Sequence, residues 1–217
     1  MGAVAYASPP TLLRSLGLES KDNSVHVNMR AMGAWALCAS SVLLAGLNGS
    51  AGFTAGVSLL AAALTSLCVV PVWESLGRPV GPQVPGIVLL AALGMLTLAE
   101  VVSPWVSACV YLLLGPLIYA TPVATAKLYM ITEPMSNLAY SLLTLAGGNI
   151  AMAGVYVASL AYGLSQSQSF AAACAINATV ALKWALLEAN GLGAPKFGPL
   201  VGAAISSLLA GAALVHE

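Results

Sequence analysis

Long apolar segments, separated by short polar ones, dominate the pattern along this chain. An α-helix rises about 1.5 Å per residue, so about 20 apolar residues cross a bilayer core of about 30 Å with every backbone hydrogen bond made inside the helix. The segments are too long and too continuous for the alternating strands of a β-barrel. The pattern therefore predicts an all-α integral membrane protein. Its seven predicted transmembrane helices cover residues 28–47, 52–70, 86–103, 105–121, 137–162, 169–187 and 198–215.

The positions of the basic residues favour seven crossings over six. The segment at 105–121 is the weakest of the seven, because it is short and contains Pro116. If it crosses, every Lys and Arg falls on the side of the N-terminus; if it does not, the last three move to the opposite side. Basic residues favour the side from which a membrane protein is inserted, so we expect the N-terminal side to be cytoplasm, stroma or matrix. The basic residues are Arg14, Lys21, Arg30, Arg78, Lys127, Lys183 and Lys196.

Two parts of the chain match when the sequence is shifted by 114 residues. Both parts start on the same side of the membrane, which predicts two parallel three-helix repeats with one helix between them, a 3+1+3 plan. The expected divisions are an N-terminal interfacial segment at 1–25, a first repeat at 26–103, a linker helix and loop at 104–134, and a second repeat at 135–217. The matched pairs include Glu74 and Glu188, Gly77 and Gly191, Pro85 and Pro199, and Gly49 and Gly163.

The repeated Glu, Gly and Pro predict how a helix ends and the next one begins at the basic side. A Glu ends the helix at the headgroups, a Gly adopts the left-handed turn, and a Pro starts the following helix. Arg78 follows Glu74 by four residues in the first of these loops. We expect an exposed Arg78 that anchors the loop at the membrane surface, because an exposed ion pair with Glu74 would add at most about 1 kcal/mol.

The N-terminal segment is expected to lie along the membrane surface. Pro9 and Pro10 would start a short helix there, and Leu12, Leu13 and Leu16 would face the lipid.

Composition excludes a soluble or nucleic-acid-binding protein. Hydrophobic residues make up 59% of the 217 residues, charged residues make up 6%, and the mean hydropathy is +0.93. A soluble domain carries about 25% charged residues on its surface. The seven basic and seven acidic residues balance, so no polyanionic partner is indicated. The four cysteines have no metal-ligand spacing and are expected to pack as small apolar residues.

No motif of an enzyme is present in the sequence. The two histidines, His26 and His216, are not part of a Ser-His-Asp set or an HExxH motif, and the chain has no phosphate-binding or dinucleotide-binding loop. We therefore expect a non-catalytic protein.

Five residues are candidates for binding a cofactor. His26 and His216 are interpreted as residues at the two membrane surfaces, and they would be the axial ligands if a chlorophyll or haem is bound. Glu100 is expected at the lipid-water boundary. Asn149 and Asn177 lie deep in predicted helices, where an amide hydrogen-bonds to a neighbouring helix or contacts a ligand.

Small residues one helical turn apart predict close helix packing. Gly147 and Ala151, followed by Gly154 and Ala158, form such a face in the fifth predicted helix. The last helix carries a further run at 202–213, which is more small surface than its own bundle needs. This surplus indicates neighbouring subunits or embedded cofactors.

These observations favour an accessory, non-catalytic subunit of a large energy-converting membrane complex, a photosystem or a respiratory complex. Its partners would be other membrane subunits and lipid, in a thylakoid or inner mitochondrial membrane. It would hold chlorophyll, carotenoid or structural lipid between its helices.

The alternative is a transporter or channel for a small neutral solute. The 3+1+3 plan resembles that of the SWEET sugar transporters. This resemblance implies a solute site between the repeats, near Asn149 and Asn177. SWEET proteins begin on the outer side of the membrane, which is opposite to the orientation expected here.

Overall fold

The computed structural model describes residues 2–15, 18, 20–192 and 196–215, and these residues form helices and connections with no strand. His216 and Leu16 lie outside the described residues. The elements are α1 (Gly2–Ala7), α2 (Pro9–Ser15), α3 (Asn23–Gly46), α4 (Ala51–Glu74), η1 (Gly81–Gln83), α5 (Val84–Leu98), α6 (Pro104–Ala120), α7 (Pro122–Leu128), α8 (Asn137–Tyr162), α9 (Gln166–Lys183), the π-helix η2 (Trp184–Glu188), α10 (Ala189–Leu192) and α11 (Phe197–Val215).

Each of the seven predicted helices overlaps a helix of the structure, although 86–103 ends five residues beyond α5 and 169–187 covers both α9 and η2, and polar residues cap most of the helix starts. A side-chain oxygen just before the first turn accepts a hydrogen bond from a backbone N–H that has no partner inside the helix. The capping residues are Asp22 for α3, Ser50 for α4, Ser103 for α6, Ser136 for α8 and Ser165 for α9.

The structure is a helical bundle, and its described residues include five helical segments long and apolar enough to cross a membrane. A sixth crossing results if α6 and α7 count as one span, although they meet at an angle of 115°. The bend occurs at Thr121 because the following Pro122 keeps the preceding residue out of the helical conformation. The helix α11 is apolar but shorter than a typical span over its described part. The seven-crossing 3+1+3 plan is therefore not confirmed.

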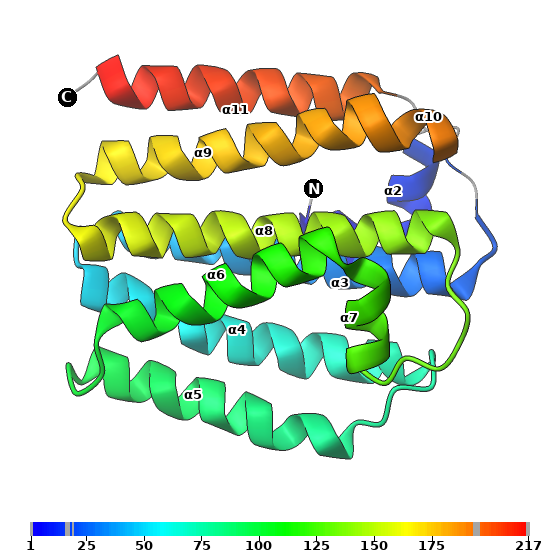
Figure 1. Cartoon of the computed structure of the whole chain (residues 1–217), viewed down its shortest axis with the longest axis horizontal. Coiled ribbons are helices and arrows are strands. Elements are labelled where there is room, and N and C mark those ends of the chain that lie inside the picture. Colours follow the sequence, from blue (N-terminus) through cyan, green and yellow to red (C-terminus); the bar gives the residue numbers. More distant parts are fainter. Residues whose placement is uncertain (1, 16–17, 19, 193–195, 216–217) are drawn as a thin grey trace.

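The connections gather at two ends of the bundle (Figure 1). The short turns 47–50, 99–103 and 163–165 lie at one end, whereas α2, α7 and α10 lie at the other. Gly49 and Gly163 close two of the short turns, and both have the positive φ predicted for a tight corner. The basic residues belong to the end that holds α2, α7 and α10.

The two loops that match in sequence differ in structure. Glu74 ends α4, and Gly77 has a φ of +78°, as predicted. The prediction for the second loop is wrong: Gly191 lies inside α10, and the helical chain continues past Glu188 to Leu192. The division into two repeats stays a prediction.

The N-terminal helix α2 packs against protein, so the prediction that its leucines face lipid is wrong. Leu12 and Leu13 are buried in a cluster with Val25 of α3 and Trp184 of η2. The apolar face of this short helix covers the ends of longer helices, which bury it more completely than a headgroup layer would.

Replacing Leu13 by alanine should lower the free energy of unfolding by about 2 to 5 kcal/mol, because Leu13 is only 1% exposed and its removal leaves a cavity. Leu44→Ala is the matched control, since Leu44 is 67% exposed on α3. The measurement is unfolding of both variants in mixed detergent micelles, followed by circular dichroism. Equal effects at the two positions would contradict the docking of α2.

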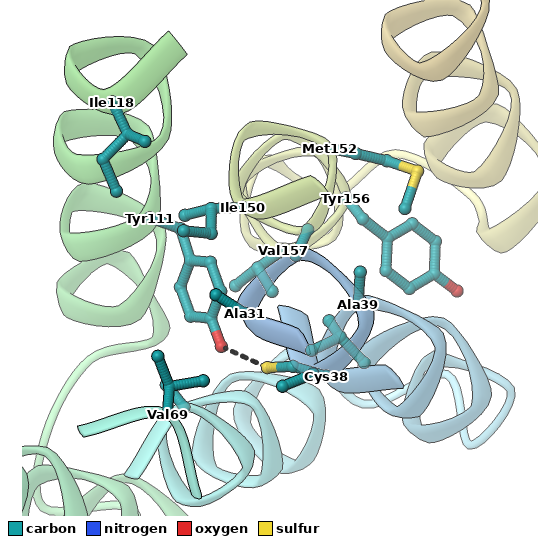
Figure 2. Packing of buried hydrophobic residues seen from close by; sticks show 14 of the residues in the cluster. Ala31, Cys38, Ala39, Val69, Tyr111, Ile118, Ile150, Met152, Tyr156 and Val157 are labelled. Atoms are coloured by element: carbon teal, nitrogen blue, oxygen red, sulfur yellow. Dashed lines mark hydrogen bonds between the residues drawn. The ribbon is translucent and has the colours of Figure 1, made fainter. Parts of the chain in front are cut away.

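The centre of the bundle is the packing of α8 against α6 and α3. Tyr111 of α6 points toward Cys38 of α3, and Ile150 and Val157 of α8 lie beside it (Figure 2). The Tyr111 hydroxyl donates to the carbonyl oxygen of Ser58 in α4 at 2.6 Å. One buried aromatic side chain therefore ties three helices to the core.

The predicted close packing of small residues on α8 is confirmed. A Cβ added to Gly147 would lie 2.5 Å from the backbone nitrogen of Tyr119, and one added to Gly154 would lie 2.8 Å from the Cβ of Tyr111. Gly202 and Gly211 on α11 have open space around them. The small residues of α8 thus allow two helices to approach closely, whereas at these two glycines of α11 an added Cβ would meet none of the described residues.

The prediction for the cysteines is correct for only two of the four. Cys38 and Cys174 are buried, whereas Cys68 and Cys109 are exposed on the outside of the bundle. All four are free thiols. Exposed cysteines still suit a surface that faces lipid, because a thiol behaves as a small hydrophobic group.

Candidate functional site: an apolar cavity with a buried arginine

A cavity of about 300 Å³ lies between α3, α4, α5, α6 and α8. The helices α5 and α6 join at the turn 99–103 and diverge toward the other end of the bundle (Figure 1). Apolar side chains make up most of the cavity wall, Ser66 and Tyr111 add hydroxyl groups within α4 and α6, and a group of polar and aromatic side chains lies near the end of α4. The wall includes Trp35, Val69, Ile87, Leu90, Leu114, Ile118, Leu143 and Ile150, and the polar part includes Trp73, Arg78, Gln83 and Tyr129.

Arg78 is the unusual residue of this wall. Only 4% of it is exposed, which contradicts the prediction of an exposed anchor at the membrane surface. Its guanidinium carbon lies 4.6 Å from the ring centroid of Trp73 and 4.5 Å from that of Tyr129, and Nη2 donates to the Gln83 side chain. Cation–π contacts of this kind are worth about 0.5 to 2 kcal/mol each and replace part of the lost hydration.

The end of α4 explains why Arg78 turns inward. Gly77 takes the left-handed conformation; its N–H donates to the carbonyl of Glu74 at 2.9 Å, and the N–H of Arg78 donates to the carbonyl of Trp73 at 3.4 Å. This is a Schellman motif, which reverses the chain at the end of a helix. The residue after the glycine is thereby brought back alongside the last turn, next to Trp73.

The second aromatic wall comes from a loop that is hydrogen-bonded to this turn. The carbonyl of Leu76 accepts from the N–H groups of Thr132 and Glu133, both at 3.2 Å. Tyr129, at the end of α7, is held beside Arg78 in this way. The sharp bend between α6 and α7 therefore has a structural consequence, because it carries Tyr129 to the mouth of the cavity.

In the part of the chain that the structure describes, the charge of Arg78 has no carboxylate partner. Among the described residues, the ion pair that occurs joins Lys183 and Glu188 at 3.5 Å. The Nε of Arg78 and the Nε1 of Trp73 are buried N–H groups for which the described residues offer no acceptor. Burial lowers the pKa of Arg78 to about 10, so the guanidinium remains protonated at neutral pH. A buried charge and two unused donors consequently lie in one wall of an apolar cavity.

Such groups are rare because they are costly. A buried polar group without a hydrogen bond costs about 1 to 3 kcal/mol, and a charge without a partner costs more. Native structures tolerate them mainly at functional sites, where a ligand, an ion or water supplies the partner. This reasoning makes the cavity the candidate functional site.

The cofactor candidates predicted from the sequence do not gather at this cavity. His26 is half-buried at the start of α3, and its Nε2 lies 2.8 Å from the carbonyl of Ser20. Glu100 is exposed in a turn with a φ of +60°. Asn149 is half-buried in α8 and does not line the cavity. Cofactor binding by these residues stays a prediction.

Asn177 bonds to a neighbouring helix, as its position predicted. Its Nδ2 donates to the Oγ of Ser206 at 2.9 Å and thereby links α9 to α11. The described residues contain no group of three His, Cys, Asp or Glu side chains that could hold a metal ion.

The π-helix η2 forms a second polar cluster that the sequence did not reveal. In an α-helix, residues five apart lie on different faces, but the wider π turn brings Lys183 and Glu188 together. Glu188 accepts from the Oγ of Ser141 at 2.5 Å, and Ser141 accepts from the indole N–H of Trp184 at 2.6 Å. Each charge here has a partner, so this cluster joins α9 to α8 structurally.

Replacing Tyr111 by phenylalanine should lower the free energy of unfolding by about 1 kcal/mol, because the buried hydrogen bond to Ser58 is lost while the ring remains. Tyr162→Phe is the control, since Tyr162 is exposed at the end of α8. Unfolding in mixed micelles measures both. A neutral Tyr111→Phe variant would show that this bond does not tie α6 to α4.

The chain matches no family model, and we found no curated protein and no solved structure similar to it.

Proposed function

We propose that this chain is a non-catalytic, membrane-embedded accessory subunit that holds a lipid-like molecule in its cavity. One observation carries the proposal: a mostly apolar cavity of about 300 Å³ lies between five helices, and the buried cation Arg78 lies in its wall near one end of the bundle. Ligand sites are typically concave, about 300 to 1,000 Å³ in volume, and mostly apolar with a few placed polar groups. A molecule with an apolar chain and a polar head fits this distribution.

The proposed setting is a larger energy-converting assembly, photosynthetic or respiratory. Long helices with many exposed leucines and valines support a membrane location. The connections between most of the helices are short, so little of the chain would extend from the membrane. In this proposal α6 with α7 provides a fourth crossing and α11 a seventh.

The proposed orientation follows from the basic residues. They lie at the end of the bundle that holds α2, α7 and α10, and this end would face the cytoplasm, stroma or matrix. The N-terminus would lie on that side of a thylakoid or inner mitochondrial membrane.

Solute transport remains the alternative predicted from the sequence, but the cavity favours holding a ligand. A neutral solute would not need the cation Arg78, and neither Asn149 nor Asn177 lines the cavity. Structural lipid fits the cavity better than a pigment bound through His26, which lies outside it.

Isolation of the full chain from its native membranes in mild detergent tests this proposal. We expect it to migrate within a larger assembly and to retain a lipid or pigment that mass spectrometry of the organic extract identifies. Recovery of the chain always alone, with an empty extract, would contradict the proposed function.

A further inference from the structure

The charge of Arg78 identifies the class of ligand. We propose that the cavity selects an anionic amphiphile, whose phosphate or carboxylate group binds the guanidinium of Arg78 and whose acyl chain lies along the apolar wall. This inference rests on the proposed function, because it presumes that the cavity holds a lipid-like molecule.

The positive charge of Arg78 is not balanced by a described residue. Arg78 is buried, protonated at neutral pH and without a carboxylate partner among the described residues. Trp73 and Tyr129 stabilise the cation through their ring faces but do not neutralise it. A ligand that carries one negative charge would provide the missing partner, whereas a zwitterionic head would bring a second positive charge toward the guanidinium.

The Nε of Arg78 and the Nε1 of Trp73 are buried donors without an acceptor among the described residues, and both residues line the same cavity. Phosphate and carboxylate oxygens accept several charge-assisted hydrogen bonds at once, and a planar guanidinium matches their geometry. Nη2 of Arg78 donates to the Gln83 side chain, which helps to fix the orientation of the guanidinium.

The apolar part of the wall explains why the ligand needs an acyl chain. Beyond Arg78 the wall consists of side chains such as Val69, Leu90, Leu114 and Ile150. These groups offer nothing to a free inorganic anion. An acyl chain buries against them and contributes favourable free energy roughly in proportion to the apolar area covered.

Competitive lipid retention by the purified full chain tests the inference. The protein is mixed with equal amounts of phosphatidylglycerol and phosphatidylcholine that have identical acyl chains, and native mass spectrometry counts each bound lipid. We expect the wild type to retain phosphatidylglycerol at least about tenfold over phosphatidylcholine. Arg78→Gln should remove this preference, while Lys127→Gln should keep it, because Lys127 is an exposed cation at the same end of the bundle.

Trp73→Phe provides a second variant in case Arg78→Gln does not fold. It keeps a ring beside the guanidinium but lacks the indole N–H, so the preference should fall severalfold. Inorganic phosphate, added alone at the concentration of the lipid, should not displace phosphatidylglycerol.

Equal retention of both lipids by the wild type, an unchanged preference in Arg78→Gln, or displacement by inorganic phosphate would overturn the inference and leave the proposed function standing. If the wild type retained neither lipid, the inference and the holding function would both be wrong.

Discussion

Replacing Gly147 by alanine should lower the free energy of unfolding by about 3 kcal/mol, the upper part of the range for an overpacked core. The added Cβ would lie 2.5 Å from the backbone nitrogen of Tyr119 and 2.9 Å from the carbonyl oxygen of Gly115. Because both contacts are to backbone, no side-chain rotation can relieve them. The helices α6 and α8 would have to move apart. Reversible unfolding in mixed micelles measures the effect.

Gly211→Ala is the matched control, and it should not lower the free energy of unfolding. Gly211 lies in the helix α11, and an added Cβ there meets nothing within 4 Å. Alanine is a better helix former than glycine by about 0.5 to 1 kcal/mol, so this variant should be neutral or slightly more stable. Similar losses at both positions would mean that α6 and α8 do not approach as closely as the structure shows.

Replacing Gly86 by tryptophan should prevent ligand retention without unfolding the protein. Gly86 is exposed and lines the cavity from α5, and an added Cβ meets no atom within 4 Å, so the Cβ of the new side chain displaces no backbone. Helical side chains point back toward the helix N-terminus, and in α5 this direction leads toward Gln83 and the polar part of the cavity. We expect at least a tenfold loss of retained lipid, measured by native mass spectrometry.

Gly81→Trp controls for the general effect of a large residue in this region. Gly81 lies in η1, has open space around it and does not line the cavity. Its variant should retain lipid as the wild type does, and both variants should keep the helical circular dichroism of the wild type. Normal retention by Gly86→Trp would show that lipid binds elsewhere on the molecule.

The positions of the long helices could be predicted from the sequence because their signals are local. A continuous apolar run determines that a helix forms, and a serine or aspartate before it determines where the helix begins, as Ser50 and Ser136 show. The close packing at Gly147 was also predictable, because small residues one turn apart lie on one face of a helix.

The number of crossings could not be settled by the same reasoning. The apolar run at 105–121 is followed by a proline, and sequence alone does not tell whether the chain continues across the membrane or turns back after Thr121. The structure bends by 115° at this point. Hydropathy measures the preference of a segment for lipid, but it does not show in which direction the polypeptide continues after that segment.

The site was missed because its parts are far apart in the sequence. Arg78 was interpreted as a surface anchor, since a single arginine in a polar loop is usually exposed. Its burial depends on Tyr129, which arrives from another loop through the hydrogen bonds between Leu76 and residues 132–133. One local signal was present, because an arginine directly after the glycine of a Schellman turn is directed back toward Trp73.

The ion pair at the π-helix was also not predicted, although its two residues are close together in the sequence. Lys183 and Glu188 are five residues apart, a spacing that an α-helix does not bring together. Their contact exists because Ser141 of α8 and Tyr119 of α6 hold the two charges from outside the helix. Helical periodicity alone therefore predicted neither the ion pair nor the local change of helix type.

The central claim is that an acyl chain lies in the cavity beside Trp73, and fluorescence quenching by brominated lipid tests it most directly. The protein would keep Trp73 as its single tryptophan and would be placed in nanodiscs of phosphatidylcholine that contain a small fraction of phosphatidylglycerol with brominated acyl chains. We predict strong quenching of Trp73 by this lipid, and weak quenching by brominated phosphatidylcholine at the same fraction. Equal, weak quenching of Trp73 by both lipids would show that the cavity holds no anionic lipid.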